Sequence, residues 1–219
     1  MEKREMEPNE SEVARSVSVT QSLLWCGVLA GPFYLAVGLA QALLREGFDL
    51  GRHPLSLLAN GPGGWIQTAN FVLTGLLVLA AAVGLGRVLG PKSRAVTWFL
   101  GGFGVAMLVA AIFRADPLDG FPPGTPKGFP TSISSTGLVH FVAGAFGFIF
   151  LAISCFFAAR VLSRRNVPLA LISLLSGLAV VLGFFGGFVL PLGILGIWIA
   201  VVVGWAWLAI ISFRLNRLA

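Results

Sequence analysis

Six long apolar runs, separated by short polar segments, dominate the pattern of hydrophobic and polar residues along the chain. A helix of about 20 residues crosses the hydrocarbon core of a bilayer, where the backbone must satisfy its own hydrogen bonds. The runs lack the strict alternation of barrel strands. The pattern therefore predicts an all-α polytopic membrane protein, a six-transmembrane-helix bundle with spans at about 23–44, 65–89, 95–113, 136–161, 167–190 and 192–213.

The first 20 residues have a different character. They are polar, hold five of the nine acidic residues and show no apolar periodicity, which is typical of disorder. The apolar run behind them is longer than the core of a cleavable signal peptide, so we expect the first span to be permanent. The sequence therefore predicts a disordered cytoplasmic tail over 1–20 and a six-helix transmembrane domain over 21–219.

Composition agrees with a membrane protein, because 57% of the residues are hydrophobic and 11% are charged, where soluble domains have roughly a quarter charged. The net charge of +6 is spread in small groups between apolar spans, so we expect no nucleic-acid partner. Cys26 and Cys155 fall inside spans and lack metal-ligand spacing. We interpret both as small buried hydrophobes.

The basic residues predict the orientation. Eleven of the fifteen lie on one side of the predicted spans, and four lie on the other side, namely Arg45, Arg52, Arg114 and Lys127. Loops rich in Lys and Arg stay in the cytoplasm. Both termini are therefore predicted to be cytoplasmic, with the loops 45–64 and 114–135 outside. We expect the membrane to be the plasma membrane.

Five polar residues are predicted to lie at similar depth near the outer face. Gln67 and Asn70 are three residues apart on one face of the second span. His140 lies one turn into the fourth span, and Arg114 and Asp116 follow the third. Ionisable groups inside a membrane are expensive and often functional. These five residues are the predicted ligand-binding site, and His140 and Asp116 are the catalytic candidates.

Each of these residues also has a structural interpretation. His140 could bond a loop carbonyl or carboxylate, and Arg114 could extend to the interface or pair with Asp116. Asp116 precedes a proline and could begin a turn. Gln67 and Asn70 could join helices by hydrogen bonds. The sequence leaves both interpretations open for all five.

Several chemistries find little support. Haem held between two histidines needs a partner for His140 at membrane depth, and none is present. His53, His140 and Asp116 could supply three zinc ligands, but no HxxxH or HExxH motif accompanies them. No nucleophile elbow, Walker loop or dinucleotide-binding glycine pattern occurs. We therefore predict no cofactor and no metal.

Two parts of the sequence resemble a known family. One is the segment 53–85, HPLSLLANGPGGWIQTANFVLTGLLVLAAAVGL, and the other combines Asp116-Pro117 with the later Gly137-Leu138-Val139-His140. Both resemble the integral membrane family catalogued as domain of unknown function 998. The resemblance covers the six spans and leaves out the acidic tail. It implies a six-helix bacterial membrane protein, hence an inner-membrane location, and implies no activity.

Two hypotheses of function follow. In the first, the protein binds or senses a lipid or small amphiphile, with Arg114 meeting an anionic group. In the second, it is an enzyme acting on a lipid-soluble substrate, with Asp116 or His140 as general acid or base or with a bound metal. Membrane lipids are the expected partners in both.

In a third hypothesis, the polar residues are purely structural. The protein would then be a transporter subunit or an assembly partner. Small-residue faces at Gly27 and Gly31, and at Gly183 and Gly187, would allow close contact with a second copy of the chain. A homo-oligomer is therefore a further prediction.

Overall fold

The computed structural model describes residues 10–189 and 192–218, and within them the structure is all helical, with no strand. Six long helices are each apolar and long enough to cross a membrane. The predicted multi-pass, all-α fold is therefore confirmed. The elements are α1 (Glu10–Leu44), η1 (Leu55–Ala59), α2 (Gly64–Leu89), η2 (Pro91–Ser93), α3 (Arg94–Ile112), α4 (Ser135–Leu162), α5 (Val167–Val189) and α6 (Gly193–Asn216).

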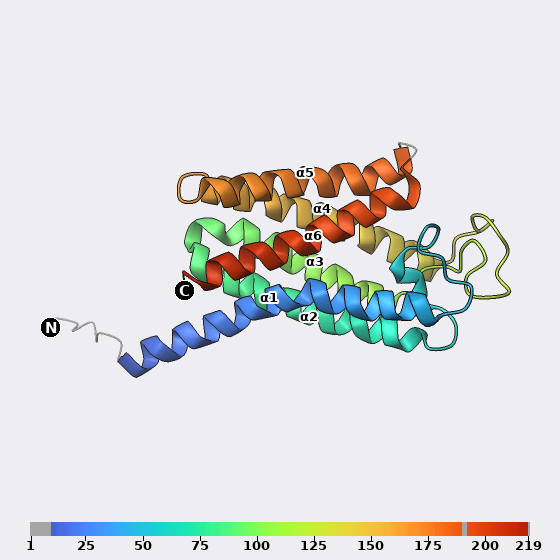
Figure 1. The fold of residues 1–219 in the computed structure, drawn as a ribbon, viewed down its shortest axis with the longest axis horizontal. Helices are drawn as coiled ribbons and strands as arrows, with labels where there is room; N and C mark the ends of the chain where they lie inside the picture. The colour runs from blue at the N-terminus through green and yellow to red at the C-terminus, as the bar shows by residue number, and fades with distance from the viewer. Residues whose placement is uncertain (1–9, 190–191, 219) are drawn as a thin grey trace.

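The six long helices form a closed ring. Each packs against the next helix along the chain, and α6 returns to pack against α1. The start of α1 and the end of α6 lie at one end of the bundle, which we call the terminus end (Figure 1). The two long loops, 45–63 and 113–134, lie together at the other end, and we call them the cap.

The beginning of α1 corrects one prediction. The structure has residues 10–20 as the first three turns of α1, so the predicted disorder is wrong for them, and residues 1–9 lie outside the described part of the chain. Extending an existing helix costs far less than starting one, because the nucleus is already formed. Glu12 also stands near the positive end of the helix dipole.

The predicted small-residue faces are used inside the chain. A side chain added at Gly31 would meet Trp205 of α6, and one at Gly27 would meet Ser212 and Ala81. Gly183 and Gly187 likewise lie against the backbone of α6 near Gly196 and Gly193. The homo-oligomer stays a prediction, but these faces are occupied by the protein's own helices.

The half of the bundle at the terminus end is filled. Small residues such as Gly84 let the helices approach closely there. Trp207 of α6 is buried and donates its Nε1–H to Ser173 Oγ at 3.0 Å. Cys155 is buried, as predicted, and Cys26 is half-buried. The fully buried residues of this half include Val78, Ala81, Leu85, Leu100, Cys155, Ala158, Trp207, Leu208 and Ile211.

Candidate ligand-binding cavity

The two loops of the cap are tied together by polar contacts. Arg45, just after α1, donates to the carbonyl oxygens of Leu58 at 3.1 Å and Asn60 at 2.5 Å. Asn60 in turn donates its side-chain amide to the carbonyl oxygen of Ala115 at 3.0 Å. These bonds hold η1 over the ends of α1 and α3, so the cap is an ordered cover.

Asp119, in the second loop of the cap, is the point where the two loops are joined. Arg52 pairs with its carboxylate at 2.7 Å, which is the one ion pair among the described residues. Asp119 has φ of 49°, a left-handed conformation that Asp tolerates better than most residues. Two hydrogen bonds lower the pKa of Asp119 below its ordinary value. The one from Arg52 has the larger effect, and the one from the Gly128 N–H has the smaller effect.

His53 is buried beneath this junction. Its Nδ1 accepts the N–H of Asp49 at 3.0 Å, so the neutral ring carries its proton on Nε2. Nε2 then donates to the carbonyl oxygen of Asp119 at 3.1 Å. Phe48 and Phe121 pack against the ring. His53 is therefore a structural histidine that joins the two loops.

A second junction links the end of α3 to the start of α4. Asp116 accepts hydrogen bonds from Ser134 N at 3.0 Å and Ser134 Oγ at 2.5 Å, while Ser134 caps α4 by accepting the Gly137 N–H. A side chain at Gly137 would collide with the Asp116 carboxylate. One turn later, His140 Nδ1–H donates to the Phe113 carbonyl oxygen at 2.8 Å. The Asp-Pro and Gly-x-x-His motifs thus join the end of α3 to the first turns of α4 through hydrogen bonds.

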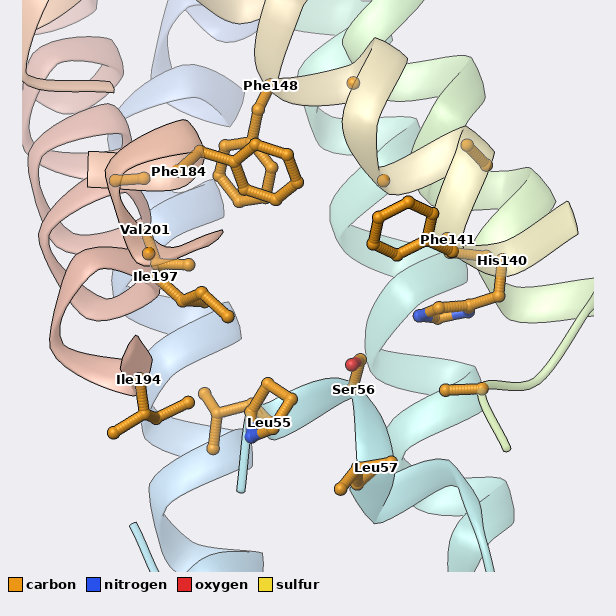
Figure 2. A pocket seen from close by; sticks show the side chains of 18 of the residues that line it. Leu55, Ser56, Leu57, His140, Phe141, Phe148, Phe184, Ile194, Ile197 and Val201 are labelled. Atoms are coloured by element: carbon orange, nitrogen blue, oxygen red, sulfur yellow. The ribbon is translucent and has the colours of Figure 1, made fainter. Parts of the chain in front are cut away.

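A cavity of about 500 Å³ lies beneath the cap, inside the ring of helices. Ligand sites for small molecules commonly measure 300–1,000 Å³ and are mainly apolar. Figure 2 shows α4 on one side, α6 on the other and η1 across the cap end. The ring of His140 and the hydroxyl of Ser56 point into the space between them. Most of the other lining side chains are apolar.

Aromatic rings close the deep end of the cavity. Phe184 of α5 stacks on Phe148 of α4, with ring centres 4.5 Å apart. Phe148 contacts Phe103 of α3, Phe103 contacts Trp205 of α6, and Trp205 contacts Tyr34 of α1. All five rings line the cavity, and we call them the aromatic floor. The floor crosses five of the six helices.

The structure brings together only part of the predicted site. His140 and Asp116 line the cavity. Arg114 is exposed and does not line it. Gln67 and Asn70 are fully buried between α1 and α2, where they contact Gln41 and the Tyr34 carbonyl oxygen rather than the cavity.

The two predicted halves therefore meet only indirectly. Phe71 stands between them, and its ring contacts both Tyr34 and His140. The amides of Gln67 and Asn70 follow the structural interpretation, as polar links between helices. Helix packing turned their shared face toward α1, and the spacing of residues within one span does not specify that rotation.

The sequence did not predict several of the residues that line the cavity. The rings of the aromatic floor lie in apolar spans, where a lining ring looks the same as a core ring. Trp198 of α6 also lines the cavity, and its Nε1–H donates to the Leu50 carbonyl oxygen of the cap at 2.9 Å. Arg52 and Asp119 carried one usable signal, because they are opposite charges in two loops predicted to share a face.

The polar groups limit the chemistry that the cavity offers. Both carboxylate oxygens of Asp116 accept bonds from Ser134, so this group acts as a brace. His140 is held from α3 with its ring facing the cavity. Within residues 10–189 and 192–218, no three His, Cys, Asp or Glu side chains form a group that could hold a metal ion.

A family model described as "Protein of unknown function (DUF998)" matches residues 28–214, which is most of the chain. The chain belongs to this family. The match confirms the resemblance drawn from the two motifs, and it runs from within α1, through the cap and α2 to α5, into the last turn of α6. Neither a curated protein nor a solved structure matches the sequence.

Proposed function

We propose that this DUF998 protein binds a lipid or small amphiphile in the cavity beneath the cap. The observation that carries the proposal is the partly open, largely apolar space of about 500 Å³ in a chain with six membrane-crossing helices. An apolar ligand group gains roughly 0.8 kcal/mol for each methylene removed from water, so such a space favours hydrocarbon.

The distribution of polar groups supports one direction of binding. Apart from the Tyr34 hydroxyl at the floor, the polar side chains of the lining lie at the cap end, namely Arg52, Ser56, Asp116 and His140. The polar end of the ligand would therefore lie below the cap. His140 can form a hydrogen bond to it through Nε2, because Nδ1 already bonds the Phe113 carbonyl oxygen. The apolar part of the ligand would extend toward the aromatic floor.

The enzymatic alternative has less to support it. Asp116 is occupied by Ser134, so acid–base chemistry would rest on His140 alone. Binding requires only the cavity and a polar contact, and both are features of the described residues. We therefore favour binding or sensing over catalysis.

A pair of glycine variants tests the binding proposal. Gly144 lines the cavity and a Cβ there would have no heavy atom within 4 Å, so Gly144→Leu adds a side chain at the position where the wall has open space. Gly101 lies outside the lining, and a Cβ there would meet only Leu79, at 3.9 Å. Gly101→Leu is therefore a matched control, with the same apolar addition on a neighbouring helix.

The measurement is mass spectrometry of lipids extracted from each protein purified in mild detergent. We expect one amphiphile class to be enriched at near-stoichiometric level in wild type and Gly101→Leu, and at least about tenfold less in Gly144→Leu. Equal amounts in all three proteins, or no enriched class in any of them, would contradict the proposal.

We also propose that the cap faces the outside of a bacterial plasma membrane, because most Lys and Arg residues lie toward the opposite end. Single cysteines at the exposed positions Thr131 and Ser163 test this, in a chain whose native cysteines are replaced. A membrane-impermeant maleimide should label Thr131→Cys in intact cells and Ser163→Cys only after lysis. The reverse pattern would invert the orientation.

A further inference from the structure

The cavity is elongated along α4. Its lining on this helix includes His140, Gly144 and Phe148, which are four residues apart and so lie in a row on one face. At a rise of 1.5 Å per residue, His140 and Phe148 are separated by about 12 Å along the helix axis. The polar end and the aromatic floor are therefore the two ends of a long space.

The walls between these ends are apolar and shaped differently on the two sides. On α4, Ala143 and Gly144 carry little or no side chain, and a Cβ on Gly144 would have no heavy atom within 4 Å. On α6, Ile197 and Val201 stand opposite, with their branched side chains directed into the space (Figure 2). A long apolar space that is open at Gly144 on one side and bordered by branched side chains on the other suits a narrow, unbranched chain.

The aromatic floor lies at the deep end of this space, where Leu151 also contributes to the lining. Phe148 and Phe184 are stacked, and Phe184 is buried, so neither ring can turn aside without breaking contacts. The rest of the aromatic floor continues from Phe148 across the ring of helices. A chain that enters from the cap end therefore meets aromatic rings at a fixed depth.

We infer that the ligand is a single-chain amphiphile with one linear hydrocarbon chain, and that Phe148 and Phe184 set the maximum length of that chain. This inference rests on the proposed function. An extended chain advances about 1.2 Å per bond, so the 12 Å between His140 and the floor holds about ten carbon atoms. Longer chains gain nothing further from the cavity.

The test measures binding of unbranched alcohols, from hexanol to octadecanol, to the purified full chain in detergent by native mass spectrometry. Affinity should rise about fourfold for each added carbon until the floor is reached, and then stay level. In Phe148→Ala the affinity should keep rising for about four more carbons of chain length, because removing the ring adds its space to the cavity. We call the chain length at which the affinity stops rising the break. Phe148→Leu should move the break to a longer chain by fewer carbons than Phe148→Ala does.

Phe150→Ala is the matched control, since Phe150 lies on the same helix, packs against Phe99 and Phe146, and does not line the cavity. Its break should stay at the wild-type length. A break that is absent in wild type, or unmoved in both Phe148 variants, overturns the length limit while binding itself stands. Binding of no alcohol to wild type, or equal binding to Gly144→Leu, overturns the proposed function together with the inference.

Discussion

The two halves of this ring of helices are built from the same kinds of residue and yet differ in what they enclose. At the terminus end, glycine and alanine bring the helices into contact, and the core residues there, Trp207 among them, are fully buried. At the cap end, the same ring surrounds a cavity of about 500 Å³. Glycine in a membrane helix can therefore serve close packing or open space, depending on what stands opposite.

Two glycines illustrate the difference. A Cβ on Gly84 of α2 would lie 3.0 Å from the Leu23 Cβ and 3.1 Å from the Leu24 backbone nitrogen. A Cβ on Gly144 of α4 would meet nothing within 4 Å. The first glycine allows two helices to touch, and the second widens the cavity.

The largest effect that we predict separates these two glycines. Gly84→Leu forces α1 and α2 apart, because the opposing atoms include backbone that cannot turn aside, and should cost about 3 kcal/mol. Gly144→Leu should cost less than about 0.5 kcal/mol, since the cavity accepts the side chain and leucine favours helix over glycine. Chemical unfolding in detergent measures both.

An equal loss in the two variants would contradict the comparison. It would mean that the space beside Gly144 is filled by protein in solution. The Gly101→Leu control used for lipid binding serves here as well, because it should behave as Gly144→Leu does. A loss in Gly101→Leu alone would point to an effect of the substitution on α3 itself.

A smaller effect concerns how the cap is held over the hollow half. The pKa of Asp119 is lowered by the hydrogen bond from Arg52. A carboxyl whose folded pKa lies below the unfolded value, about 4 for Asp, stabilises the fold above that pH and loses this contribution as the pH falls through the folded value.

Removing the charge should therefore matter at neutral pH and not in acid. Asp119→Asn should lower Tm at pH 7 by roughly 2 °C or less, because the ion pair is solvent-exposed. The difference from wild type should shrink as the pH falls below the unfolded pKa of about 4 and vanish once the pH lies below the folded pKa. Glu46→Gln, a change at an exposed acid of the same cap, should leave Tm unchanged at both pH values. A pH-independent loss in Asp119→Asn would assign the effect to its backbone contacts instead.

Much of the fold was predictable, because each span is a local property. The lengths of the apolar runs located all six helices to within a few residues, apart from the early start of α1. The motifs around Asp116 and His140 contain residues that line the cavity. Their roles were open, since whether a carboxylate begins a turn or braces Ser134 depends on a partner eighteen residues away.

Gln67 and Asn70 mark the limit of that reasoning. Their spacing placed them correctly on one face of α2, but the rotation of α2 relative to α1 and α4 directed that face to Gln41. Rotation is decided by the sum of many packing contacts along the helix, including the close approaches of α2 to α3 at Gly75 and to α1 at Gly84.

By itself, the sequence determined that this chain crosses the membrane six times and which loops carry its few charges, because hydrocarbon thickness and backbone hydrogen bonding act on each segment separately. Only the tertiary structure decided that one half of the bundle is hollow, that His53, Arg52 and Asp119 lock the cap, and that five helices contribute rings to one floor. Those features are contacts between residues far apart in the chain, and they arise from the way the ring of helices closes.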